Sequence, residues 1–154
     1  MFLLTSPLLS IVGVLGLGFF YALVIRVEKV DVIRQICLAS SLLALFIGVM
    51  SVLSFDKSVA GYQFMSSFNY MPQYNLSFAV GVDGLSFVFL LLTLITFPPL
   101  FLAAWPVSTS PKQFFCHLMG MELLLVLTFI TLDLFYFFVL FESLLIPMFI
   151  LIGV

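Results

Sequence analysis

Two carboxylates lie inside long apolar stretches of this 154-residue sequence. Glu122 falls within an apolar run at residues 114–132, and Glu142 falls within a second run at residues 134–154. A charged side chain at the centre of a bilayer costs at least about 2.5–3.5 kcal/mol, so such residues are candidates for function. The chemistry that they indicate is proton transfer. The alternative for each is a protonated, hydrogen-bonded structural residue.

A buried carboxyl group favours its neutral form unless a cation lies close to it. At about 4 Å and an effective dielectric constant near 20, the attraction between the two charges is about 4 kcal/mol. A cation that moves or titrates would therefore switch the carboxyl group between its protonated and ionised forms. The apolar runs contain no Lys or Arg. We therefore expect the counter-charge to come from another chain or from sequence beyond Val154.

Two further polar residues lie near the ends of these runs. His117 is the one histidine and lies close to Lys112, so it is either an interfacial residue or a member of a proton relay. Asp133 separates the two last apolar runs and is either a solvated acid of a turn or the entry point of a relay.

Three prolines inside apolar runs predict local changes in helix geometry. Pro147 removes the helical hydrogen bond to the carbonyl of Ser143, which is next to Glu142, and the freed carbonyl could hold water. Pro98 and Pro99 remove two such bonds from the third run and predict a kink or a local break there. A kink without a function is common, so the pair is a weaker candidate than Glu142.

The composition is that of a membrane protein. Hydrophobic residues make up 64% of the chain and charged residues 8%, with a mean hydropathy of +1.36. The net charge of −2, with five scattered bases, excludes nucleic-acid binding through a basic surface. Cys37 and Cys116 have no closely spaced Cys or His companion, so we expect packing residues and no metal site. A single histidine also argues against a haem held by paired histidines.

Apolar runs of about 20 residues are long enough to cross a bilayer. The sequence therefore predicts an all-α integral membrane protein in one domain, with about five transmembrane helices at 2–25, 36–55, 85–105, 114–132 and 134–154. Only Asp133 separates the last two, which requires a tight reversal and places Glu122 and Glu142 on adjacent antiparallel helices, each near the middle of the membrane.

The charges of the connections predict the orientation. Arg26, Lys29 and Arg34 fall in the first connection, which we therefore expect on the inner side. The long loop at 56–84 then lies on the outer side and the C-terminus on the inner side. The loop ends in a short extended stretch at residues 77–82, and Asp83 after it is placed to cap the third helix.

Three motifs in the second half of the chain resemble a known family. They are Val80-Gly81-Val82-Asp83-Gly84-Leu85-Ser86-Phe87, Leu132-Asp133-Leu134-Phe135-Tyr136-Phe137-Phe138 and Phe141-Glu142-Ser143-Leu144-Leu145-Ile146-Pro147-Met148. Together they look like subunit 4 of the mitochondrial NADH:ubiquinone oxidoreductase, complex I, and its bacterial counterparts. The resemblance extends from about residue 68 onward, and the first two helices share only the pattern.

The resemblance implies the N-terminal part of an antiporter-like subunit of about 14 helices, with two inverted five-helix repeats. Glu142 matches the family glutamate of the fifth helix, which pairs with a lysine on a broken seventh helix. It also implies proton pumping coupled to the oxidation of NADH by ubiquinone, in the mitochondrial inner membrane or a bacterial plasma membrane. No flavin, quinone or iron–sulfur cluster is expected on this chain, because other subunits carry them.

The chain reaches only the fifth helix of that family. We therefore expect a separate chain to supply the remaining helices and the partner lysine, with a truncated or incomplete sequence as the alternatives. The other partners implied are membrane-arm subunits of complex I and membrane lipids. Two competing functions are a subunit of a multi-subunit Na⁺/H⁺ antiporter, whose family shares parts of the motifs, and a purely structural membrane anchor.

Overall fold

The computed structural model describes residues 6–58, 60–71, 73 and 76–153, which form five helices and one β-hairpin. The elements are α1 (Pro7–Val24), α2 (Val30–Ser54), β1 (Gln63–Met71), β2 (Leu76–Val82), α3 (Gly84–Ala103), α4 (Pro111–Ile130) and α5 (Leu134–Gly153). All five helices are long and apolar enough to cross a membrane. The prediction of an all-α, multi-pass membrane fold with five spans is confirmed.

The helix boundaries differ from the predicted runs at the starts of α1, α2 and α4. α1 begins at Pro7 after the extended Ser6, and residues 2–5 of its predicted run lie outside the described residues. α2 begins at Val30 rather than at residue 36, so Asp31 and Arg34 belong to the helix and not to the first connection. A run counted by hydropathy misses this charged first turn, which is stable because Asp31 lies at the positive end of the helix dipole. α4 begins at Pro111 rather than at residue 114, since proline suits the first position of a helix.

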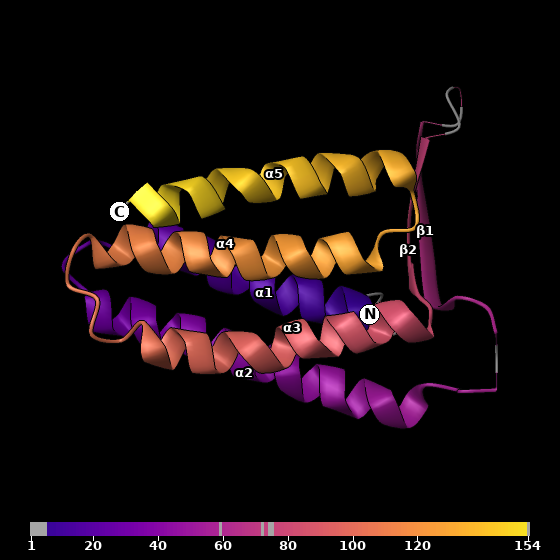
Figure 1. Ribbon diagram of the computed structural model, residues 1–154, viewed down its shortest axis with the longest axis horizontal. Coiled ribbons are helices and arrows are strands. Elements are labelled where there is room, and N and C mark those ends of the chain that lie inside the picture. The colour runs from indigo at the N-terminus through magenta and orange to yellow at the C-terminus, as the bar shows by residue number, and fades with distance from the viewer. Residues whose placement is uncertain (1–5, 59, 72, 74–75, 154) are drawn as a thin grey trace.

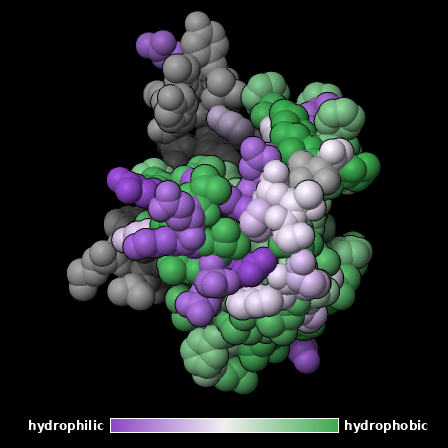
Figure 2. All heavy atoms as spheres, turned by 90° about the vertical axis from the view of Figure 1, so that its left-hand side faces the viewer, coloured by the Kyte–Doolittle hydropathy of each residue, from purple (hydrophilic) through white to green (hydrophobic). Residues whose placement is uncertain are grey.

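The helices run side by side along one direction and alternate in sense (Figure 1). The connections α1–α2 and α3–α4 lie at one end with the C-terminal end of α5, and the hairpin lies at the opposite end with the turn from α4 to α5. α4 contacts all four other helices, whereas α5 packs mainly against α4. The end with the first and third connections carries a group of hydrophilic side chains with hydrophobic ones around it (Figure 2).

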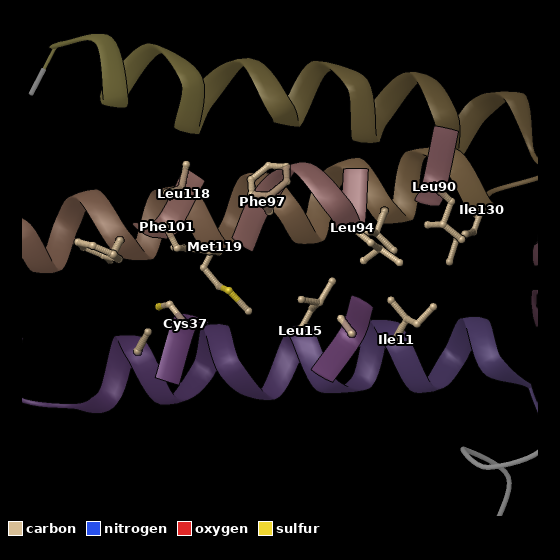
Figure 3. Close-up of a cluster of buried hydrophobic side chains, with 14 of the residues drawn as sticks. Ile11, Leu15, Cys37, Leu90, Leu94, Phe97, Phe101, Leu118, Met119 and Ile130 are labelled. Atoms are coloured by element: carbon tan, nitrogen blue, oxygen red, sulfur yellow. The ribbon is translucent and has the colours of Figure 1, made fainter. Parts of the chain in front are cut away.

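The core is a continuous apolar cluster between the first four helices. Figure 3 shows Ile11 and Leu15 of α1 pointing toward side chains of α3 and α4, among them Leu94 and Ile130. Helices approach closely where a glycine allows it: a Cβ on Gly48 would lie 2.6 Å from Leu94 Cδ1. This close packing of α2 against α3, together with the contacts that α4 makes with both, sets the positions in which α2 and α4 bring their few polar side chains together.

The hairpin ties the start of α5 to the rest of the fold. β1 and β2 pair in antiparallel fashion, and Val80 forms an isolated bridge with Thr131 at the end of α4. Leu132 N–H also donates to the carbonyl of Ala79 at 3.0 Å. The extended stretch predicted at residues 77–82 lies within β2, whereas its partner strand β1 was not predicted.

Asp83 caps α3, as predicted. Its Oδ1 accepts a hydrogen bond of 2.8 Å from Ser86 N–H, and its backbone is extended. Hydrogen bonds from the backbone and then the hydroxyl of Ser86 hold the pKa of Asp83 below its usual value. The carboxylate is therefore the form that stabilises the helix start.

Replacement of Asp83 by Ala is expected to lower the free energy of unfolding by about 1 kcal/mol, because an N-cap acceptor is lost. Asp83→Asn keeps an acceptor and is the matched control. Because the folded pKa lies below the unfolded one, the contribution of the charge is complete above the unfolded pKa of about 3.9 and is lost as the pH falls through the folded pKa. Titration with SDS in mixed micelles measures both effects, and equal stability of the two variants at pH 7 would contradict the cap.

Candidate functional site: two intramembrane carboxylates

Glu122 is completely buried between α4 and α2. Its Oε1 accepts a hydrogen bond of 2.7 Å from the hydroxyl of Ser41 on α2. Its Oε2 is also buried and has no hydrogen-bond partner within the described residues. The environment is therefore polar on one side of the carboxyl group and apolar on the other. Such a site either holds a neutral, hydrogen-bonded acid or needs a further hydrogen-bond partner for Oε2.

Ser41 reaches Glu122 because the buried side of α2, apart from Ile33, is built from small residues. The buried positions of α2 are Ile33, Cys37, Ser41, Ala44, Gly48 and Ser51, which recur at intervals of three or four residues. This spacing places them on one face of the helix, and the small side chains let α4 come close. Ser41 was not predicted as a site residue from the sequence. Its only signal is a hydroxyl in an apolar run.

Glu142 has the opposite environment. It lies on α5 with an exposed side chain, and α5 has Pro147 as its one buried position in the described part of the chain. Glu142 and Ser143 contribute the polar atoms of an open apolar groove of about 750 Å³, which is otherwise lined by Phe138, Val139, Leu145, Ile146, Phe149 and Ile150. A carboxylate in an uncovered apolar groove on a membrane helix requires a partner that covers it.

The two carboxylates do not form a pair in this structure. Their helices are antiparallel neighbours, as predicted, but Glu122 bonds to α2 while Glu142 is exposed on α5. All five Lys and Arg residues lie in the described part of the chain, and none forms an ion pair with Glu142. They are Arg26, Lys29, Arg34, Lys57 and Lys112. The five helices therefore contain no counter-charge for Glu142.

The other sequence candidates lie near helix ends. Asp133 begins the turn into α5, where its Oδ1 accepts from Phe135 N–H at 2.9 Å and its carbonyl from Phe137 N–H. His117 lies on the first two turns of α4, and its Nδ1 is 2.7 Å from the carbonyl oxygen of Gln113. Asp133 thus has a structural role as a helix cap, and neither residue contacts Glu122 or Glu142 through a hydrogen bond in the described chain.

The prolines lie inside continuous helices. α3 runs from Gly84 to Ala103 through Pro98 and Pro99 without a break, and a kink at the two prolines stays a prediction. The helix continues because a proline removes single hydrogen bonds, while close packing of Pro98 and its neighbours holds the backbone. Pro147 is likewise internal to α5 and buried against the bundle.

Arg34 was assigned to a loop from sequence but connects two parts of the fold. Its guanidinium bonds to Asp31 at 3.1 Å and donates to the carbonyl of Val107 at 2.9 Å. It also lies 5.8 Å from the ring centroids of Trp105 and Phe115. These contacts join the start of α2 to the α3–α4 connection.

Comparison with known proteins places these helices in a family. No protein-family profile matches the chain. The chain is similar to NADH-ubiquinone oxidoreductase chain 4 of Arabidopsis thaliana, with 37% identity over 139 residues that cover 90% of this chain and 28% of the relative. It is similar also to NADH-quinone oxidoreductase subunit M of Rhodobacter capsulatus, with 31% identity over 121 residues, 79% of this chain and 23% of the relative.

The chain belongs to the chain 4 and subunit M family. The chain is similar also to the chain 4 protein of Marchantia polymorpha, with 35% identity over 139 residues that cover 90% of this chain and 28% of the relative. This chain corresponds to the N-terminal part of the family and spans about a quarter of the length of the relatives that it matches. The resemblance drawn from the motifs around Asp83, Asp133 and Glu142 is therefore confirmed.

Proposed function

We propose that this chain forms the N-terminal part of a proton-translocating, antiporter-like subunit of a NADH:ubiquinone oxidoreductase, complex I. The observation that carries the proposal is Glu142, an intramembrane carboxylate exposed in an apolar groove on α5, with none of the chain's own bases beside it. The names of the family members support the enzyme. The groove supports a site that is completed by other helices.

In this proposal Glu142 is one half of a charge pair. A lysine from helices outside these five approaches the groove, and its ammonium favours the ionised carboxylate. When the lysine moves away or loses its proton, the carboxylate in its apolar surroundings takes up a proton. Pro147 leaves the carbonyl of Ser143 without its helical donor, so this carbonyl can hold a water beside the carboxylate.

The wider assignments follow from the same proposal. The partners are other membrane-arm subunits of complex I and the helices that carry the lysine, whether they belong to a separate chain or to the same polypeptide. The site is in the mitochondrial inner membrane, as the eukaryotic relatives support, or in a bacterial plasma membrane for a chain of the Rhodobacter type. The flavin and iron–sulfur clusters of the enzyme lie on other subunits.

Isolation of the native assembly in mild detergent tests this function. The proteins that co-purify with the chain are identified by mass spectrometry, and NADH:quinone reductase activity is assayed in the same fraction. We expect complex I subunits, a membrane segment with a central lysine, and activity. After reconstitution into vesicles, NADH oxidation is expected to acidify the side to which protons are pumped.

Two results would replace the proposal. Sodium-dependent proton exchange without NADH oxidation in that fraction would indicate a Na⁺/H⁺ antiporter subunit. The second result combines two measurements. If the native assembly pumps protons normally, and cross-linking from a Glu142→Cys variant finds no lysine within reach of that position, the chain is a structural anchor.

A further inference from the structure

A second groove lies at the end of the bundle that carries the first and third connections. It has a volume of about 370 Å³ and lies between the end of α1 and the start of α4. Leu23, Val27 and Cys116 supply much of its mostly apolar lining, and Lys112, Gln113 and His117 lie along it. Leu23 and Val27 are 48% and 63% exposed, so the groove opens at the surface of the described chain.

Lys112 is fixed at the mouth of this groove. Its Nζ donates to the carbonyls of Leu23 at 2.9 Å and Ile25 at 2.6 Å. An ammonium group has three donors, so two bonds to the end of α1 leave one donor for another acceptor. The ammonium charge is neutralised by no carboxylate in the described chain, where the one ion pair is that of Arg34 with Asp31.

Two further features make the mouth favourable for an anion. The N-terminal turn of α4 begins here, and Ser110 before it forms no side-chain cap, so the first N–H groups of the helix have no side-chain acceptor from that residue. Arg26, Glu28 and Lys29 lie in the short connection that directly follows α1, and all three are exposed, so this connection carries one positive charge in excess.

The groove therefore joins an apolar channel to a cationic mouth at one end of a membrane bundle. This end is also where hydrophilic side chains gather beside hydrophobic ones (Figure 2). A soluble anion would bind at the mouth and leave the apolar channel empty. A phospholipid fits both parts, because its phosphate can bind at the mouth and its acyl chain can lie in the channel. We propose that the groove binds a phospholipid with an anionic headgroup, its phosphate at Lys112 and an acyl chain along Leu23 and Val27.

The inference does not depend on the proposed enzyme, and photolabelling tests it in the native assembly. Membranes that contain the full protein are mixed with phosphatidylglycerol or phosphatidylcholine, each with a diazirine on one acyl chain, and are then irradiated. Labelled peptides are mapped by mass spectrometry. We expect the phosphatidylglycerol probe to label the segments around Leu23–Val27 and Pro111–His117 in clear excess over the phosphatidylcholine probe.

Three variants separate the charge from the channel. Lys112→Gln is expected to reduce the excess of phosphatidylglycerol labelling about fivefold, which corresponds to the roughly 1 kcal/mol that one basic residue contributes at an anionic surface. Val27→Trp fills the channel without touching a polar contact, and should reduce labelling of these segments by both probes. Lys57→Gln removes the same charge from the opposite end and should change neither.

Several outcomes would overturn the proposal. Equal labelling of the wild-type segments by the two probes would remove the headgroup preference, and no labelling by either would mean that protein covers the groove. An identical effect of Lys112→Gln and Lys57→Gln would exclude a local role for Lys112. Displacement of the probe by inorganic phosphate, but not by chloride at the same ionic strength, would indicate a site for a free anion.

Discussion

Replacement of Glu142 by Gln is expected to reduce proton translocation by at least about tenfold while the assembly still forms. Glutamine has the shape of glutamate but carries no charge and cannot release a proton at neutral pH. The attraction lost between the carboxylate and a cation about 4 Å away is about 4 kcal/mol at an effective dielectric constant near 20. The measurement is the initial rate of NADH-driven acidification in vesicles, together with NADH:quinone activity.

Two variants serve as controls for this result. Glu142→Asp keeps the charge and should retain more pumping than Glu142→Gln, because the exposed groove leaves room for the shorter side chain. Glu28→Gln makes the same chemical change at an exposed residue of the first connection and should leave pumping unchanged. Normal pumping by Glu142→Gln, at equal amounts of assembled enzyme on native gels, would contradict the charge pair.

Replacement of Ser41 by Ala is expected to lower the free energy of unfolding by about 1–2 kcal/mol. Ser41 provides the hydrogen bond of 2.7 Å to Glu122, whose other oxygen already has no partner in the described chain. The variant would leave a fully buried carboxyl group without the one hydrogen bond that the structure gives it. Titration of the purified protein with SDS in mixed micelles measures the change.

Ser40→Ala is the matched control for this variant. The Ser40 hydroxyl bonds to carbonyls of its own helix, Ile36 at 2.8 Å and Cys37 at 3.0 Å, and across to α4 it meets only the Met119 sulfur at 3.7 Å, a weak acceptor. We therefore expect a change in stability well below that of Ser41→Ala. Glu122→Gln should also be mild, because its side-chain oxygen can still accept from Ser41. A loss in Ser40→Ala equal to that in Ser41→Ala would remove the special role of the Glu122 contact.

The two carboxylates thus lead to different experiments, although the sequence presents them in the same way. Glu122 is enclosed between two helices and should be tested through stability. Glu142 is open on the outer helix and should be tested through transport. If Glu122→Gln also reduced pumping at unchanged stability, Glu122 would join Glu142 as a proton-carrying group.

Hydropathy and length alone determined the class of this protein and its five spans. Backbone N–H and C=O groups must be hydrogen-bonded within lipid, so an apolar run of about 20 residues has few alternatives to a helix. Local rules were sufficient for the Asp83 cap, which involves only residues three apart. The charged first turn of α2 was missed because a span predicted from hydropathy stops where charged residues begin, here at Arg34. Besides the favourable place of Asp31 in the helix dipole, Arg34 anchors this turn through contacts with residues more than 70 positions away.

Tertiary packing decided which polar groups meet. The partner of Glu122 is 81 residues away on α2, and no local pattern indicates which face of α4 turns toward it. The exposure of Glu142 depends on α5 packing on one side of the bundle, with Pro147 inward. The lipid groove requires the end of α1 to meet the start of α4. Within an apolar run, every face of a helix is nearly equally soluble in lipid, so close packing rather than hydropathy selects the buried side.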